Sequence, residues 1–150
     1  MYNLFNPSDT AEILRRLEKL DPNAPRQWGK MNVNQMLAHC SASLETAMGL
    51  NSPEKLNPFL RLIGRMLKGK FFGNKPFTKN SQTDKTYIIT GSPDFNSEKR
   101  KVIAQIRIFS EGGPAKCTTR THVFFGPLTA EEWAIMQWKH FDHHLRQFGL

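Results

Sequence analysis

Apolar residues recur every three or four positions in four long stretches of the chain, the spacing that places them on one face of an α-helix. This spacing predicts long helices over residues 8–20, 33–48, 97–109 and 129–148, and a short helix over residues 58–67. Helix-start signals support the pattern: Ser8 or Asp9 can cap the first helix, and Asn32 and Asn57 can cap later ones. Thr129 and Glu132 form a capping box. The chain is therefore predicted to be all-α.

The connection between the second and third long helices differs from the others in its length. It holds the short helix and then nearly thirty residues, 68–96, in which only residues 86–90 suggest a strand. Residues 117–128 are also irregular. Four long helices predict a four-helix bundle, with the extra short helix and the long loops forming the crossover. At 150 residues, the chain has the size of a single domain spanning residues 1–150.

Three features bear on where the protein resides. The N-terminal residues lack the basic and apolar regions of a signal peptide, and no stretch approaches the roughly 18–20 apolar residues that cross a bilayer. Cys40 and Cys117 are too few for a disulfide scaffold, and Cys40 falls within an apolar stripe, where it acts as a small hydrophobic residue. We therefore expect a cytoplasmic protein without a membrane span.

The net charge of +8 is concentrated in one segment. Residues 55–85 contain eight basic residues and one acidic residue, a balance of +7, so the rest of the chain carries only +1. Phenylalanines interleave with these charges, a composition that can bind nucleic acid, anionic lipid or an acidic small molecule. Most such segments form only a solvated surface, and the predicted helix is short, so nucleic acid and lipid are disfavoured. Attraction of an anionic substrate is the preferred interpretation.

The last predicted helix holds three of the five histidines within five residues. At about 100° per residue, four residues return to within about 40° of the start, so His140 and His144 lie on the same face. That face also carries Trp133 and Met136 and is expected to point into the bundle. His143 lies about 60° from His140, on the other side of the apolar stripe.

Two imidazoles one helical turn apart can bind a single divalent cation, although two ligands alone bind weakly. His39, at the flank of the apolar stripe of the second helix, is the candidate for a third ligand from a neighbouring helix. Three histidine ligands leave one or two positions for water or substrate, which is typical of catalytic sites. Phe141 follows His140 where the helical zinc-protease motif has Glu, so that class is excluded.

The spacing is equally compatible with histidines that are hydrogen-bonded core residues or cations near a helix C-terminus, so both interpretations stay open. If a metal binds, a glutamine can hold the second ring nitrogen of a ligand, and the candidates are Gln35, Gln137 and Gln147. His122 is a further candidate ligand, but a loop histidine before two aromatic residues is more typical of packing or capping.

Three motifs resemble a known family. They are W-G-K-M-x-V-x-Q-M-L-x-H-C at residues 28–40, H-x-F-F-G-P-L-T-x-E-E-W at residues 122–133, and K-H-x-D-H-H-L-R-Q-F-G at residues 139–149. Together they resemble an uncharacterised branch of the DinB superfamily of metal-dependent proteins, also called DinB/YfiT-like. The resemblance implies a four-helix bundle with zinc or nickel held by His39, His140 and His144, and it matches Gln147 to the family's glutamine after the last ligand. The doubled His143-His144 leaves the register open by one residue.

The resemblance also implies a class of reaction. Some members of that superfamily are thiol-dependent S-transferases or isomerases that use a low-molecular-weight thiol. The expected function is therefore a divalent-metal-dependent S-transferase or hydrolase acting on a small molecule. The alternatives are a non-catalytic helical bundle with structural histidines and a module that binds an anionic ligand or nucleic acid through residues 55–85. A homodimer is left open, because helix bundles with exposed apolar edges often dimerise.

Overall fold

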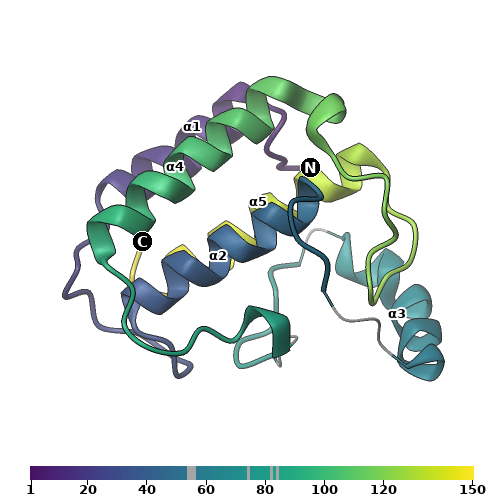
Figure 1. The fold of residues 1–150 in the computed structure, drawn as a ribbon, viewed down its shortest axis with the longest axis horizontal. Coiled ribbons are helices and arrows are strands. Elements are labelled where there is room, and N and C mark those ends of the chain that lie inside the picture. Colours follow the sequence, from purple (N-terminus) through teal and green to yellow (C-terminus); the bar gives the residue numbers. More distant parts are fainter. Residues whose placement is uncertain (54–56, 74, 82, 84) are drawn as a thin grey trace.

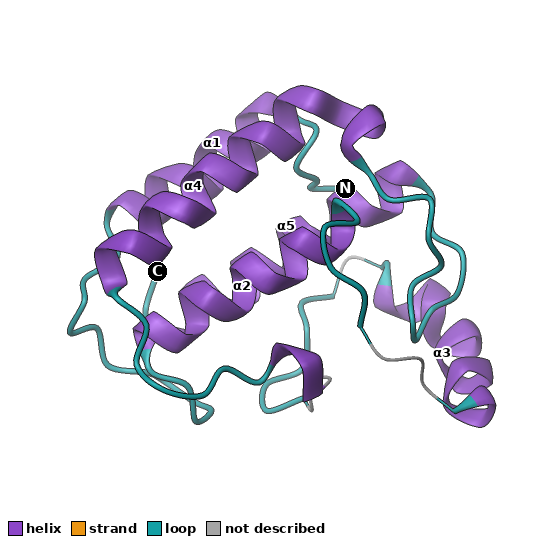
Figure 2. Cartoon of the chain, viewed as in Figure 1, coloured by secondary structure: helices purple, strands orange, loops and turns teal. Residues whose placement is uncertain are grey.

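The computed structural model describes residues 1–53, 57–73, 75–81, 83 and 85–150, and these contain helices but no strand. The helices are α1 (Pro7–Glu18), α2 (Val33–Ala47), α3 (Pro58–Phe71), α4 (Phe95–Gly112) and α5 (Ala130–Gln147), with two short 3₁₀ turns, η1 (Lys85–Tyr87) and η2 (Gly113–Lys116). Figure 2 shows that loops join these helices throughout. The prediction of an all-α protein is confirmed.

Four of the helices form a bundle in which each packs against two others. α1 contacts α4 and α5, and α2 contacts the same two helices from the opposite side. Figure 1 shows α1 beside α4 in one layer and α2 beside α5 in the other. α3 belongs to the crossover between α2 and α4 and lies at one end of the bundle, so the predicted four-helix bundle with an extra crossover helix is present.

The core is built from the apolar faces of these four helices, and α5 contributes most to it. Twelve of the 18 residues of α5 are buried, including the fully enclosed Trp133 and Phe141. Ile13 of α1 and Phe109 of α4 close the core from the other layer. Because α5 is buried on more than one side, its polar residues also lie inside the protein and need partners.

The helix ends follow local capping rules. Asn32 and Thr129 begin α2 and α5, each in a complete capping box, as the sequence predicts. The cap of α1 was assigned to Ser8 or Asp9, but it is Asn6, whose side chain accepts hydrogen bonds from both their backbone N–H groups. Pro7 then occupies the first helical position, where its missing N–H costs nothing.

Three other sequence expectations need correction. α4 begins at Phe95 and not at residue 97, because the Asp94 side chain caps the helix by accepting from the Ser97 N–H. α3 continues four residues past its predicted end at residue 67, to Phe71. The described chain has no strand over residues 86–90, where Lys85–Tyr87 form a 3₁₀ turn. The isolated β-bridge of the described chain lies elsewhere and pairs His122 with Gly126.

No helix in the described part of the chain is long and apolar enough to cross a membrane.

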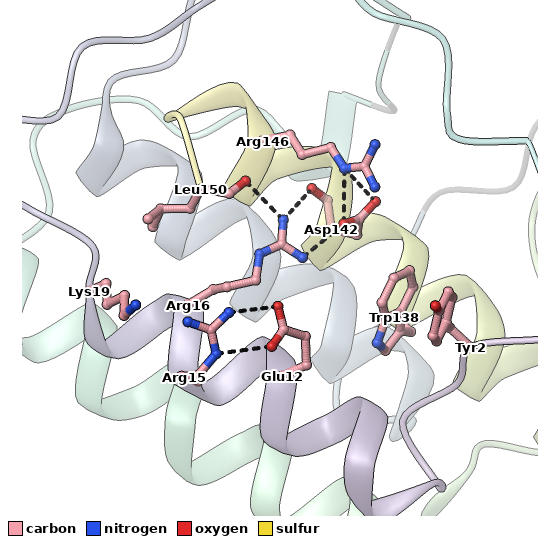
Figure 3. A pocket seen from close by; sticks show the side chains of 9 residues that line it. All are labelled: Tyr2, Glu12, Arg15, Arg16, Lys19, Trp138, Asp142, Arg146 and Leu150. Atoms are coloured by element: carbon pink, nitrogen blue, oxygen red, sulfur yellow. Dashed lines mark hydrogen bonds and ion pairs between the residues drawn. The ribbon is translucent and has the colours of Figure 1, made fainter.

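A buried ion pair joins α1 to α5. Arg16 donates to a carboxylate oxygen of Asp142 at 2.8 Å, and both side chains are less than 10% exposed. Arg16 also donates to the Leu150 carbonyl at 3.0 Å, and Arg146 binds the other Asp142 oxygen at 3.0 Å (Figure 3). These residues line a pocket of about 540 Å³ between the two helices. Asp142 is two residues from both His140 and His144, and two residues correspond to about 200° of rotation, so this pocket and the histidines lie on opposite sides of α5.

This pair generates a prediction about stability. Arg16→Met leaves a buried carboxylate held only by the largely exposed Arg146, so we expect the free energy of unfolding to fall by about 3 kcal/mol. Arg15→Met on the neighbouring position is the matched control, because the Arg15–Glu12 pair is exposed and contributes little. Urea denaturation measures both variants. Equal losses would contradict the role assigned to Arg16, and the double variant Arg16→Met with Asp142→Leu should recover most of the loss.

Candidate metal site

Three histidines from two neighbouring helices meet beside the core. His39 comes from α2, and His140 and His144 come from α5; their ligand nitrogens all lie within 4.8 Å of one another. Ring centroids are separated by 4.8 Å for His39–His140, 4.8 Å for His39–His144 and 4.6 Å for His140–His144. The rings therefore form a nearly equilateral triangle, and the predicted grouping of these three residues is present.

The backbone explains how they meet. One turn of α5 separates His140 from His144, so both rings project from one face. α2 packs against α5, which places His39 opposite the pair. His39 and His144 are buried, whereas His140 is partly exposed, so the cluster lies close to the surface.

His39 is oriented by a backbone carbonyl from the crossover. Its Nδ1 lies 2.9 Å from the Tyr87 carbonyl oxygen, at the end of η1. A carbonyl oxygen only accepts, so Nδ1 carries the proton and Nε2 keeps its lone pair. That Nε2 faces the other two rings.

His144 is oriented in the same way by Gln147. Its Nδ1 lies 2.8 Å from the Gln147 side-chain oxygen, and the Gln147 amide nitrogen donates to the Trp28 carbonyl at 2.7 Å. The second bond fixes which amide atom faces His144, so its Nδ1 donates and its Nε2 lone pair is free. Gly29 makes this approach possible: its φ is 78°, and a Cβ there would overlap the Gln147 amide.

His140 is the ring without a complete set of partners. Its Nε2 lies 2.9 Å from the His39 Nε2, and its buried Nδ1 has no hydrogen-bond partner in the described structure. Metal-bound nitrogens lie about 2.0–2.1 Å from the ion, so two of them are roughly 2.9 Å apart at an angle of about 90° and roughly 3.3 Å apart at the tetrahedral angle. The spacing of His39 and His140 and the converging lone pairs therefore fit a shared cation.

The electrostatic surroundings keep these rings neutral. Removal from water lowers the pKa of His39, and it lowers that of His140 well below the usual range, with the charges of His144 and His39 adding to the effect. Burial, with His39 beside it, lowers the pKa of His144 to about 3. A metal binds the deprotonated ring, so the surroundings favour the protonation state that a metal needs.

The remaining sequence candidates lie in other roles. Gln35 does not orient His39: its side-chain oxygen completes the α2 capping box, and its amide donates to the Gly91 carbonyl. Gln137 bonds to Ser43 of α2 and not to a histidine. Of the three glutamines, Gln147 contacts a histidine of the cluster.

The other two histidines lie outside the triangle. His143 packs against the rings of Trp28 and Phe77. His122 accepts hydrogen bonds from the backbone N–H groups of Phe124 and Phe125 and stacks on Phe125, the capping and packing role expected for it. The register of the cluster is therefore His140 and His144.

Sequence reasoning missed the contributions of Tyr87 and Trp28. Both act through backbone carbonyls in loops, and a carbonyl is present at every residue, so composition gives no sign of them. Gly29 after Trp28 is the one local indication of this contact, because a glycine permits the positive φ of the turn that faces Gln147.

The fold and the cluster define a class, an all-helical bundle with three converging histidines. The chain belongs to the family described as "Protein of unknown function (DUF1569)", whose model matches residues 5–149. The match covers nearly the whole chain, from before α1 to the end of α5. No curated protein and no solved structure gives a significant match.

The buried histidines predict how stability depends on pH in the metal-free protein. Their pKa values are lowered on folding, so below about pH 6.5 the unfolded chain takes up protons that the folded chain does not. We expect the free energy of unfolding in EDTA to be steady above pH 7 and to fall progressively below about pH 6.5. Urea titrations at several pH values measure this. Below pH 6.5, the free energy of unfolding should change less steeply with pH in His144→Leu than in the wild type. An unchanged slope would contradict the burial of His144 as a cause of the pH dependence.

Proposed function

We propose that this protein binds one divalent metal ion through His39, His140 and His144. The observation that carries the proposal is the tautomer arrangement: Tyr87 and Gln147 each accept from a histidine Nδ1, which leaves two Nε2 lone pairs converging with His140. In a purely structural cluster the His140 Nε2–H can donate to the His39 Nε2 at 2.9 Å, but one ring donates only once, so the two Nε2 lone pairs of His39 and His144 cannot both be satisfied by His140. A cation satisfies all three together.

The proposed chemistry follows from the number of ligands. Three imidazoles leave coordination positions for water or a substrate, and a bound metal lowers the pKa of water or a thiol so that hydroxide or thiolate is present near neutral pH. We propose hydrolysis or S-transfer, with a low-molecular-weight thiol as cosubstrate in the second case. The DinB-like motifs support the S-transfer alternative. Imidazole ligands suit zinc and nickel, which are the proposed metals.

The protein's own residues would orient the ligands and the substrate. Gln147 and the Tyr87 carbonyl hold two rings in the tautomer that presents Nε2. Near the cluster, Trp28 packs against His143, and the ammonium group of Lys79 lies 4.4 Å from the Trp28 ring centroid. This cation and the basic crossover favour an anionic small-molecule substrate.

The first test is metal content. Protein purified without a histidine tag and reconstituted with zinc or nickel should retain about one equivalent after desalting, measured by plasma mass spectrometry. His39→Ala, His140→Ala and His144→Ala should each lose it, whereas the neighbouring His143→Ala should keep it. A folded wild type that does not retain metal would assign the histidines a structural role. Loaded protein is then assayed for ester hydrolysis and for thiol conjugation.

A second prediction concerns Gln147. Gln147→Leu removes the acceptor of the His144 Nδ1–H, so we expect metal affinity to fall by about 10–100-fold. Gln137→Leu is the matched control on the same helix, because Gln137 bonds to Ser43 and not to a histidine. Competition with a metal-sensitive dye measures both dissociation constants. Comparable losses in the two folded variants would contradict the orienting role of Gln147.

A further inference from the structure

α3 contacts the rest of the protein through the side of the helix that carries Gly64 and Lys68. Gly64 is the buried residue of this helix, and a Cβ there would overlap the Phe124 carbonyl. Lys68 forms an ion pair with Glu132 at 2.8 Å and donates to the Pro127 carbonyl at 2.8 Å. These contacts fix the helix against residues 124–132, as Figure 1 shows for α3 beside the loop before α5. The attachment leaves the opposite side of the helix facing outward.

That outward side is apolar. Five large hydrophobic side chains are exposed on this one helix, half of the ten such residues in the described chain. They are Phe59 (67% exposed), Leu60 (42%), Leu62 (56%), Met66 (78%) and Leu67 (45%). Exposed apolar surface concentrated in this way marks a binding site for a partner or a membrane.

The helix is strongly amphipathic. At 100° per residue, these five side chains span an arc of about 160°, and Arg61, Arg65 and Lys68 lie on the opposite arc. Lys70 falls within the apolar arc near the end of the helix, where a long side chain can extend its charge toward a polar layer. α3 contains no acidic residue. An apolar face together with Lys and Arg as the only charged residues is typical of helices that lie in the plane of a lipid surface.

We propose that α3 attaches this protein peripherally to an anionic lipid membrane, with Phe59, Leu62 and Met66 inserted below the headgroups. Lys70 of the helix and the exposed Lys75 of the following loop provide attraction to the headgroups. The surrounding segment, residues 55–85, carries +7, although Lys55 and Asp84 lie outside the described residues.

Charge disfavours the competing occupants. A second copy of the chain would bring the same cationic segment against itself, and like charges facing each other are unfavourable. Nucleic acid would bind the cationic arc, but Lys68 on that arc is engaged with Glu132, while the outward arc offers aliphatic side chains and a single phenylalanine. An anionic surface with an apolar interior matches both the charge and the exposed face.

Vesicle flotation tests the proposal on the full chain. Wild type should float with phosphatidylcholine vesicles containing about 30% phosphatidylglycerol and not with pure phosphatidylcholine, and binding should weaken as salt rises from about 0.1 to 0.5 M. Leu62→Glu with Met66→Glu should reduce binding by about tenfold or more, because both apolar contact and charge attraction are lost. Ile108→Glu is the control, since Ile108 is exposed to a similar degree on α4.

A charge variant separates the two contributions. Lys70→Gln with Lys75→Gln should weaken binding to anionic vesicles several-fold, whereas Arg100→Gln with Arg107→Gln on α4 should not. Circular dichroism and urea midpoints confirm that each variant is folded. Wild type that fails to float with anionic vesicles would overturn the proposal. So would a wild-type dimer, measured by light scattering, that Leu62→Glu with Met66→Glu converts to monomer. Metal content is independent of this outcome.

Discussion

The burial of polar side chains on two opposite sides of α5 is the constraint on which the rest of the structure depends. Most of α5 has little contact with water, so its buried polar groups need partners from neighbouring helices. Asp142 meets Arg16 of α1 on one side. His140 and His144 meet His39 of α2 on the other side. The two sets of contacts hold α5 against α1 and α2 and fix its rotation about its own axis.

The two sides satisfy this requirement in different ways. On the α1 side, the Arg16 guanidinium faces the Asp142 carboxylate, and Arg146 donates further hydrogen bonds to that carboxylate. On the α2 side, three rings of one kind face one another, and burial keeps them uncharged. His39 and His144 commit their Nδ1 protons to Tyr87 and Gln147, so both present an Nε2 lone pair, and the single Nε2 of His140 can donate to at most one of them. The lone pair left without a donor is the feature on which the proposed metal site rests.

Much of the fold and of this cluster follows from local sequence signals. Hydrophobic periodicity and capping residues define α2 and α5, and helical spacing pairs His140 with His144, because both depend only on neighbours within a few positions. His39 joins them because a bundle brings its helices together. Gln35 was misassigned because two local rules compete there: it is one turn before His39, but it is also the third residue after the Asn32 cap, and the capping box prevails.

The parts that sequence did not indicate depend on loops. The Tyr87 and Trp28 carbonyls orient two of the rings, and their positions follow from how the crossover and the α1–α2 connection run over the bundle. The length of α3 was underestimated because Gly64 and Gly69 weaken its helical pattern. In the structure, Gly64 is needed for packing, because the absence of a side chain allows the helix to approach the Phe124 backbone closely.

The orientation of α3 is set by the body of the protein and not by its own hydrophobicity. An amphipathic helix left to itself would turn its apolar side toward the core, which lowers the free energy by removing that surface from water. Here Lys139 of α5 opposes this, since its ammonium group donates to the Phe71 and Gly73 carbonyls at 2.6 and 2.8 Å and holds the C-terminal end of the helix. Lys139 is itself 8% exposed, so the anchor is a buried cation with two acceptors. Three contacts hold α3 in this orientation: the Lys139 hydrogen bonds, the approach of Gly64 to Phe124, and the Lys68–Glu132 ion pair. They keep the apolar face of α3 exposed, so that it is accessible to an apolar partner outside the protein.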